Sequence, residues 1–165
     1  IPGISCESCH GPGGEHVALS KAGKPSKEKI YNPAKLSPDA LSQDFCGSCH
    51  RSAESAMSLP QSGGKSNVRF QPYRIFGSKC YSDDQRISCT ACHNPHEPMQ
   101  TSAAYYDAKC AACHNKAAEP QAKLCKVANK NCVSCHMPKT ELEGAQHQFV
   151  DHRIRIVKPA ENYPF

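Results

Sequence analysis

Five short cysteine and histidine motifs carry the most distinctive chemistry in this sequence. In each, two cysteines separated by two residues are followed directly by a histidine, and the five copies lie at 6–10, 46–50, 89–93, 110–114 and 132–136. CxxCH is the attachment signature of c-type haem, in which both thiols form thioethers and the histidine binds the iron. The sequence therefore predicts five haem c groups. The attachment cysteines are Cys6, Cys9, Cys46, Cys49, Cys89, Cys92, Cys110, Cys113, Cys132 and Cys135, and the proximal histidines are His10, His50, His93, His114 and His136.

Cysteine pairs of this spacing also occur in zinc ribbons and in thioredoxin-like redox sites. A zinc site would need the histidines only occasionally, and a disulfide framework would need none. Because every one of the five pairs is followed by a histidine, covalent haem is the interpretation that explains the whole pattern.

The chain has one histidine fewer than the axial positions of five haems. Nine histidines are available for ten axial positions, so four haems can be bis-histidine and one cannot. Met57 is the freest thioether candidate for the odd position, which another group could also fill or which could stay open. We expect the haem of Cys46, Cys49 and His50 to be the odd one, since no spare histidine lies near it in sequence. The histidines left as distal ligands are His16, His96, His147 and His152.

Local sequence supports these distal roles, although each histidine could instead be a solvated loop residue. His16 follows a glycine-rich turn that lets the backbone pass close to a flat porphyrin face. His96 comes too soon after His93 to bind the same iron, so we expect it to bind a neighbouring haem. We expect Asp151 or a backbone carbonyl to orient the imidazole of His152, as groups around metal ligands commonly do.

Composition predicts that the cofactors form much of the interior. Ile, Leu, Val and Phe together number 24 of 165 residues and Trp is absent, which is poor for a folded chain. We therefore expect the apoprotein not to fold. The formal net charge of +5 would be balanced by the ionised propionates of five haems, so nucleic-acid binding is not expected. Nor does any apolar run reach the length of a membrane span. The arginines expected to meet propionates are Arg69, Arg74, Arg86, Arg153 and Arg155.

Several elements are predicted between the motifs. Pro38 is suited to the first position of a short helix over 40–50, and 103–116 is good helix sequence. Residues 67–76 place two arginines among aromatics, which favours a segment laid across haem edges, the alternative being a plain extended connector. The alternation over 153–157 predicts a strand.

Cys80 and Cys125 are the two cysteines outside the motifs. In an oxidising compartment two leftover thiols are best read as a disulfide. Closing a loop of about 45 residues would stabilise the fold by roughly 4 kcal/mol on the chain-entropy account.

Longer phrases around the motifs resemble the multihaem c-type cytochromes related to the cytochrome c554 family. They cover 5–16, 69–73, 87–96, 132–138 and 149–154. The resemblance implies a mostly irregular fold with short α-helices wrapped around a stacked haem array, electron transfer, and distal roles for His16, His96 and His152 in particular. Pentahaem nitrite reductases match in haem number, but they use CxxCK at the active haem, and that motif does not occur in this sequence.

The expectation is thus one pentahaem domain over 1–165, with 157–165 as a tail that could dock elsewhere. It would act as an electron conduit between redox partner proteins, in the periplasm, at the cell surface or outside the cell, since haem of this kind is attached beyond the cytoplasmic membrane. Extracellular cytochrome filaments are built from small multihaem subunits, so a homopolymer through haem stacking is one form of this conduit. The alternative is a reductase that acts on a small nitrogen or oxygen species at one open haem.

Overall fold

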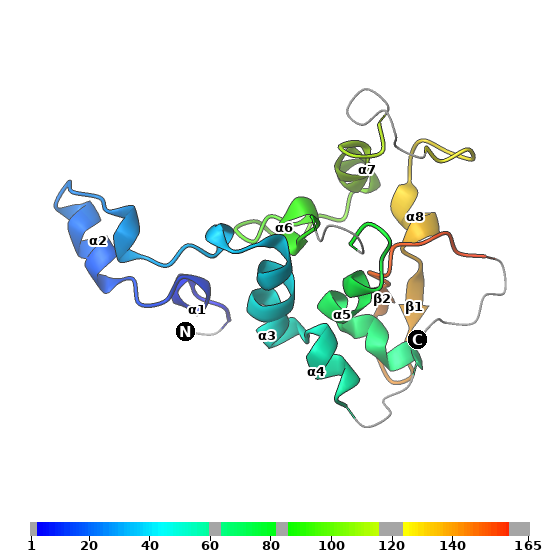
Figure 1. Ribbon diagram of the computed structural model, residues 1–165, viewed down its shortest axis with the longest axis horizontal. Coiled ribbons are helices and arrows are strands. Elements are labelled where there is room, and N and C mark those ends of the chain that lie inside the picture. Colours follow the sequence, from blue (N-terminus) through cyan, green and yellow to red (C-terminus); the bar gives the residue numbers. More distant parts are fainter. Residues whose placement is uncertain (1–2, 60–63, 82–85, 116–123, 159–165) are drawn as a thin grey trace. The chain divides into compact units, whose positions relative to one another are not determined.

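The computed structural model describes residues 3–59, 64–81, 86–115 and 124–158. In these ranges the backbone is mostly irregular, with short helices and one two-stranded sheet, which confirms the predicted fold class (Figure 1). The α-helices are α1 (Cys6–His10), α2 (Gly14–Lys21), α3 (Gly47–His50), α4 (Ala53–Met57), α5 (Gln71–Phe76), α6 (Cys89–Cys92), α7 (Ala103–Ala111) and α8 (Cys132–His136). The other elements are the 3-10 turns η1 (Lys27–Lys29), η2 (Pro33–Lys35) and η4 (Gly64–Arg69), the π-helical segment η3 (Ala40–Cys46), and the strands β1 (Lys139–Glu141) and β2 (Gln148–Val150).

The chain divides into two compact units, Ile1–Ser37 and Pro38–Phe165. The first unit contains the first motif and is closed by a backbone hydrogen bond of 3.1 Å from Tyr31 N–H to the His10 carbonyl. Gly11 ends α1 with φ of 69°, a left-handed conformation that glycine adopts without strain. The second unit contains the other four motifs. The single domain over 1–165 stays a prediction.

The helix predicted over 40–50 is confirmed as η3 followed directly by α3. Pro38 already has helical conformation, as the first-turn position of a proline allows. A side chain at Gly47 would bring its Cβ within 3.2 Å of the backbone of Ser52. Glycine at this position therefore lets the chain turn tightly from the second motif into α4.

The second unit has a small polypeptide core. Gln43 ties it together, because its Nε2 donates to the Pro72 carbonyl at 2.9 Å and its Oε1 accepts from Ala53 N–H at 2.8 Å. Three elements, η3, α4 and α5, are joined through this one side chain. The Tyr81 hydroxyl also donates to Asp39. The buried hydrophobic residues are Leu41, Ala53, Ala56, Val68, Phe70, Ile75 and Tyr81.

Residues 67–76 are largely helical, which contradicts the alternative of a plain extended connector. The expectation that this segment lies across haem edges stays a prediction. η4 ends at Arg69 and α5 begins at Gln71, with Pro72 in the first turn of α5, where its missing N–H costs nothing. Between the two helices Phe70 is buried, and the Arg69 guanidinium lies 5.1 Å from its ring centroid. Burial of an aromatic ring on one side of the segment favours the compact form over an extended connector.

The C-terminal part also differs from the predicted elements. The hairpin pairs Lys139 with Val150 and Glu141 with Gln148 in antiparallel register, whereas 153–157 form no strand. A hydrogen bond to a side chain fixes this segment instead of strand pairing. Ile154 N–H donates to the Ser78 hydroxyl at 2.8 Å. α7 begins at Ala103 as predicted but ends at Ala111. Lys116 and the tail beyond Lys158 lie outside the described residues.

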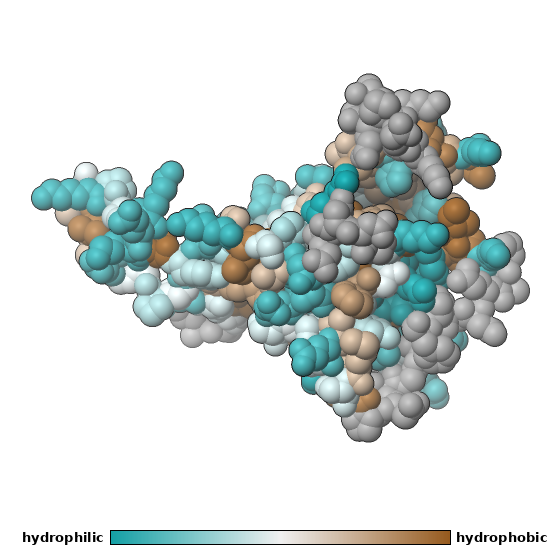
Figure 2. All heavy atoms as spheres, in the orientation of Figure 1, coloured by the Kyte–Doolittle hydropathy of each residue, from teal (hydrophilic) through white to brown (hydrophobic). Residues whose placement is uncertain are grey.

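On the face shown in Figure 2, apolar residues form small scattered patches among hydrophilic ones. None of the helices in the described part of the chain is long and apolar enough to cross a membrane.

Candidate haem sites

Each CxxCH motif lies on or directly beside a short helix. α1 and α8 span the whole of their motifs, and α3 ends at the histidine of the second. α6 runs from Cys89 to Cys92, and α7 carries Cys110 in its last turn. In α1, α6 and α8, which contain both cysteines of their motifs, the two thiols lie on one side of the helix because residues three apart share a side. This is the local geometry that two thioether bonds to one porphyrin need.

Two proximal imidazoles are oriented by hydrogen bonds to backbone carbonyl oxygens. Nδ1 of His10 lies 2.8 Å from the Tyr31 carbonyl oxygen, and Nδ1 of His136 lies 2.9 Å from that of Arg155. A carbonyl oxygen can only accept, so Nδ1 carries the proton and Nε2 keeps its lone pair. Metal-binding histidines are oriented in this way, and the residues present therefore fit haem ligation.

Two of the predicted distal histidines have the same arrangement. Nδ1 of His16 lies 3.0 Å from the Ser26 carbonyl oxygen, and Nδ1 of His152 lies 3.0 Å from that of Val150. Either Asp151 or a backbone carbonyl is expected from the sequence to orient His152, and the Val150 carbonyl makes this contact. Both Nε2 atoms have the lone pair that an iron ligand needs.

The rings of His93 and His152 are neighbours, at a separation that one shared metal ion would allow. Their ring centroids are 6.2 Å apart and the ring planes differ by 34°. A metal–imidazole bond is about 2 Å long, and the nitrogen lies roughly 1 Å from the ring centre, so two imidazoles on opposite sides of one metal have centroids about 6 Å apart. Burial lowers the pKa of both rings, which keeps them neutral and able to bind a metal. Tyr106 packs edge-on against His93 at 5.7 Å.

The last four motifs lie next to one another in space, in the order in which they follow along the chain. α6 contacts η3, α7 contacts α6, and α8 contacts α7, as the chain path in Figure 1 shows for these elements. A hydrogen bond with the Cys46 thiol lowers the pKa of Cys89 to about 6. Burial and the nearby Cys110 raise the pKa of Cys92. Burial raises the pKa of Cys132 to about 11, and the Asp107 carboxylate adds to this effect.

Asp107 joins the fourth motif to the fifth, a role that the sequence analysis missed. Its carboxylate accepts from the backbone N–H groups of Asn131 and Cys132 at 2.6 and 2.8 Å. These two bonds hold its pKa below the usual value. An aspartate three residues before Cys110 was visible in the sequence, but nothing local predicted a partner 24 residues away.

The first unit contains a cavity of about 630 Å³ beside His10. This volume lies within the roughly 300–1,000 Å³ typical of small-molecule and cofactor pockets. Lys27, Lys29 and Lys35 line it, and Lys29 forms a 3.0 Å ion pair with Glu15. Glu15 and Glu28 also line it, so the lining carries charges of both signs.

The remaining predicted ligands lie at the surface. His50, His96, His114 and His147 are exposed. The His147 ring contacts that of Phe149 in a tilted arrangement, with the ring centroids 4.4 Å apart. The Met57 side chain is 65% exposed at the end of α4. The assignments of these residues, and the choice of the second haem as the odd one, stay predictions.

The predicted disulfide is not formed, because Cys80 and Cys125 are both free thiols. The two cysteines have different surroundings. Cys80 is half-buried, and burial together with the nearby Cys113 raises its pKa. Cys125 is exposed, and hydrogen bonds from the N–H groups of Ala128 and Val127 lower its pKa.

Two of the arginines expected to meet propionates bind a carboxylate of the chain instead. Nε and Nη2 of Arg74 donate to the two oxygens of Asp151 at 2.8 and 2.9 Å, and Nη1 of Arg155 donates at 2.7 Å. Asp151 is 0% exposed, Arg74 2% and Arg155 14%. Burial acts to raise the pKa of Asp151, but the hydrogen bonds from Arg74, Arg153 N–H and Arg155 outweigh it and hold the pKa below its usual value.

Two curated proteins are similar to this chain. One is the dissimilatory sulfite reductase MccA of Wolinella succinogenes, 24% identical over 170 residues that cover 82% of this chain and 22% of the relative. The other is the multiheme cytochrome MtrA of Shewanella baltica, 24% identical over 145 residues that cover 84% of this chain and 36% of the relative. This chain thus spans about a third or less of the length of these relatives. No family model and no solved structure matches it.

The five CxxCH motifs, the oriented imidazoles and the similarity to a multiheme cytochrome agree on a class of protein. The chain is supported as a multihaem c-type cytochrome. The narrower resemblance to the cytochrome c554 family stays a prediction.

Proposed function

We propose that this chain transfers electrons through five covalently bound haem c groups, mostly bis-histidine, as a periplasmic or extracellular conduit. The observation that carries this proposal is the succession of neighbouring motifs in the second unit, from η3 and α3 through α6 and α7 to α8. When bound, haem c supplies one-electron chemistry at iron. The chain attaches each cofactor through two thiols and keeps successive attachment sites in contact.

The axial ligands suit electron transfer better than substrate binding. Imidazoles whose Nδ1 is held by a carbonyl, as in His136 and His152, keep one orientation when the charge on the metal changes. The facing rings of His93 and His152 would close both sides of one iron. We assign these two residues as the axial pair of the third haem.

A reductase is the second candidate function. The shortfall of one histidine for ten axial positions favours it, because it leaves one iron without a second imidazole. The name of one relative, dissimilatory sulfite reductase, is in keeping with small-anion chemistry in a similar protein. In this chain the candidate substrate class is a small nitrogen or oxygen species.

The partners of the conduit are redox proteins, and a homopolymer through stacked haems is the assembled form of the same function. The close spacing of the motifs along the chain suits this form, because few residues separate one cofactor from the next. Electron microscopy of the purified protein tests this form, and particles that stay single at all concentrations would contradict it.

The central experiment begins with the mass and spectrum of the native protein. Five covalent haem additions and sharp reduced bands are expected, and their absence would refute the proposal. His152→Ala should then convert one haem from low-spin to high-spin and allow it to bind CO, with all five haems still attached. Gln148→Ala is the matched control, since Gln148 is exposed on β2 and its side chain donates to Glu141 at 2.7 Å. A His152→Ala spectrum identical to that of the control would contradict the axial pair.

A further inference from the structure

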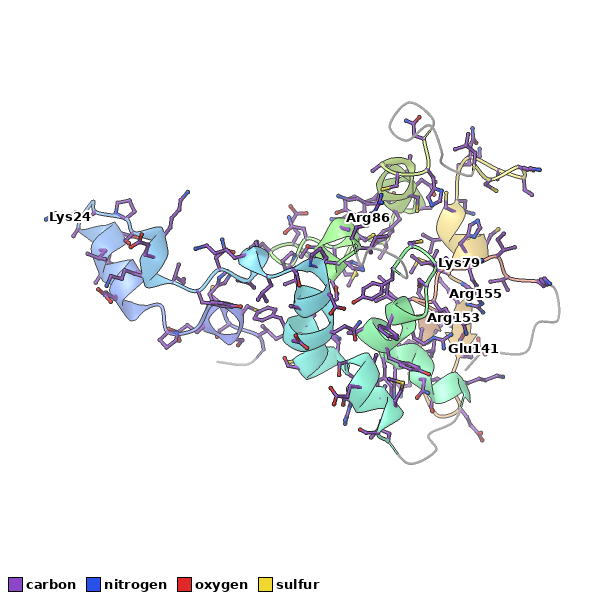
Figure 3. All side chains as sticks on the ribbon, viewed as in Figure 1. Lys24, Lys79, Arg86, Glu141, Arg153 and Arg155 are labelled. Carbon is purple, nitrogen blue, oxygen red and sulfur yellow. The ribbon has the colours of Figure 1, made fainter. Side chains whose placement is uncertain are left out.

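The segment 151–155 is anchored by a buried cluster of charged side chains that we call the Arg74–Asp151–Arg155 cluster. Arg74 approaches the Asp151 carboxylate with two N–H groups and Arg155 approaches with a third, at 2.7 to 2.9 Å. Asp151 Oδ1 also accepts from Arg153 N–H at 3.0 Å. Bidentate, charge-assisted bonds of this kind fix geometry more strictly than neutral ones. Figure 3 shows Arg153 and Arg155 near each other on the segment that follows β2.

One end of this anchored segment holds His152. The residue follows Asp151 directly, and its carbonyl accepts from the Ser78 hydroxyl at 3.0 Å. The same hydroxyl accepts from Ile154 N–H at 2.8 Å. Ser78 is 1% exposed and lies just beyond α5, the helix that carries Arg74. The backbone on both sides of His152 is therefore tied to the α5 region.

The other end of the segment holds His136. The Arg155 carbonyl accepts from Nδ1 of His136 at 2.9 Å, and Arg155 N–H donates to the His136 carbonyl at 3.3 Å. Asp151 N–H donates to the Pro138 carbonyl at 3.0 Å. One segment thus orients two imidazoles assigned to different haems, His152 as the distal candidate for the third haem and His136 as the proximal residue of the fifth.

We propose that the Arg74–Asp151–Arg155 cluster is a positioning site that holds His152 and His136 together and tunes the reduction potentials of their two haems through its buried charge. The inference rests on the proposed function, because it needs both histidines to bind iron. Reduction of a ferric haem removes one positive charge, so a nearby positive charge favours the reduced form and raises the potential. At buried positions this influence is screened far less than at the surface.

The sign of the charge provides the test. Asp151→Asn removes a negative charge and is expected to raise two of the five potentials above their wild-type values. Arg74→Gln removes a positive charge and is expected to lower the same two. If the cluster had a purely structural role, both variants would disturb the potentials, but the shifts would not have opposite signs. Glu54→Gln and Lys65→Gln remove charges of the same two signs at exposed positions outside the motifs, and they are expected to leave all five potentials unshifted.

The measurement is a redox titration of the holoprotein followed by electron paramagnetic resonance, with haem content checked by mass. Arg155→Gln provides a second variant should Arg74→Gln not fold, because Arg155 is less buried, and the same downward shift is expected. Shifts of equal sign in the aspartate and arginine variants, or five unmoved potentials in variants that keep five haems, would overturn the inference. Such a result would leave the proposed function intact, whereas a wild-type protein without covalent haem would refute the function itself.

Discussion

Replacing Gln43 by methionine tests how much of the second unit depends on polypeptide contacts. Gln43 is 9% exposed, and its amide makes two hydrogen bonds, to the Pro72 carbonyl at 2.9 Å and from Ala53 N–H at 2.8 Å. Methionine has a similar length and volume, so the substitution removes the polar partners without opening a large cavity. The effect should therefore report the two hydrogen bonds.

The expected magnitude follows from the groups left behind. Pro72 and Ala53 are buried, so water does not replace the lost amide. A buried donor or acceptor without a partner costs about 1–3 kcal/mol, and two such groups cost roughly 2–5 kcal/mol after the gain from burying an apolar side chain. At roughly 3 °C per kcal/mol for a chain of this size, Tm should fall by about 6–15 °C.

Thermal unfolding of the holoprotein, followed by far-ultraviolet circular dichroism and by the Soret band, measures this change. Gln148→Met is the control, because Gln148 is exposed and donates to Glu141 at 2.7 Å on the surface of the hairpin, where substitutions usually change stability by about 0.5 kcal/mol or less. If Gln43→Met melts within about 2 °C of the control, then these contacts do not hold η3, α4 and α5 together.

Two further predictions concern ionisable groups. Cys125 should be alkylated by iodoacetamide much faster than Cys80 in the native protein, because the thiolate is the reactive form and Cys125 is exposed with a lowered pKa, whereas Cys80 is half-buried with a raised pKa. Peptide mass analysis over time measures both alkylation rates. Equal rates would contradict the surroundings described for the two cysteines. The folded-state pKa of Asp151 is depressed, so its stabilising contribution is present above the unfolded value of about 3.9 and is lost as pH falls through the folded pKa. Asp151→Asn should accordingly lower the midpoint of guanidinium unfolding at pH 7, and this midpoint should differ less from that of the wild type near pH 3. Asp44→Asn is the control. A difference in midpoint that is the same at both pH values would show that the charge of Asp151 is not what stabilises the fold.

Local chemistry was predictable from the sequence alone. The CxxCH motifs need only residues within one helical turn, and the helix over 40–50 follows from a proline at its start and a suitable run after it. The mostly irregular class of fold was implied by the resemblance of the phrases around the motifs to multihaem c-type cytochromes. The histidine count limits bis-histidine ligation to four haems in any arrangement of the chain.

Long-range packing decided the rest. That His93 faces His152, and that Arg74 and Arg155 both bind Asp151, depends on segments far apart in sequence, for which no local pattern encodes a partner. Residues 67–76 became helical because Phe70 is buried against the core, and 153–157 formed no strand because Ser78 and His136 bind their backbone. The sequence by itself determined which groups are available for ligation and attachment, because that chemistry depends on residue type and short spacing. Only the tertiary structure decided which of them meet, since a contact across many residues is set by the packing of the whole unit.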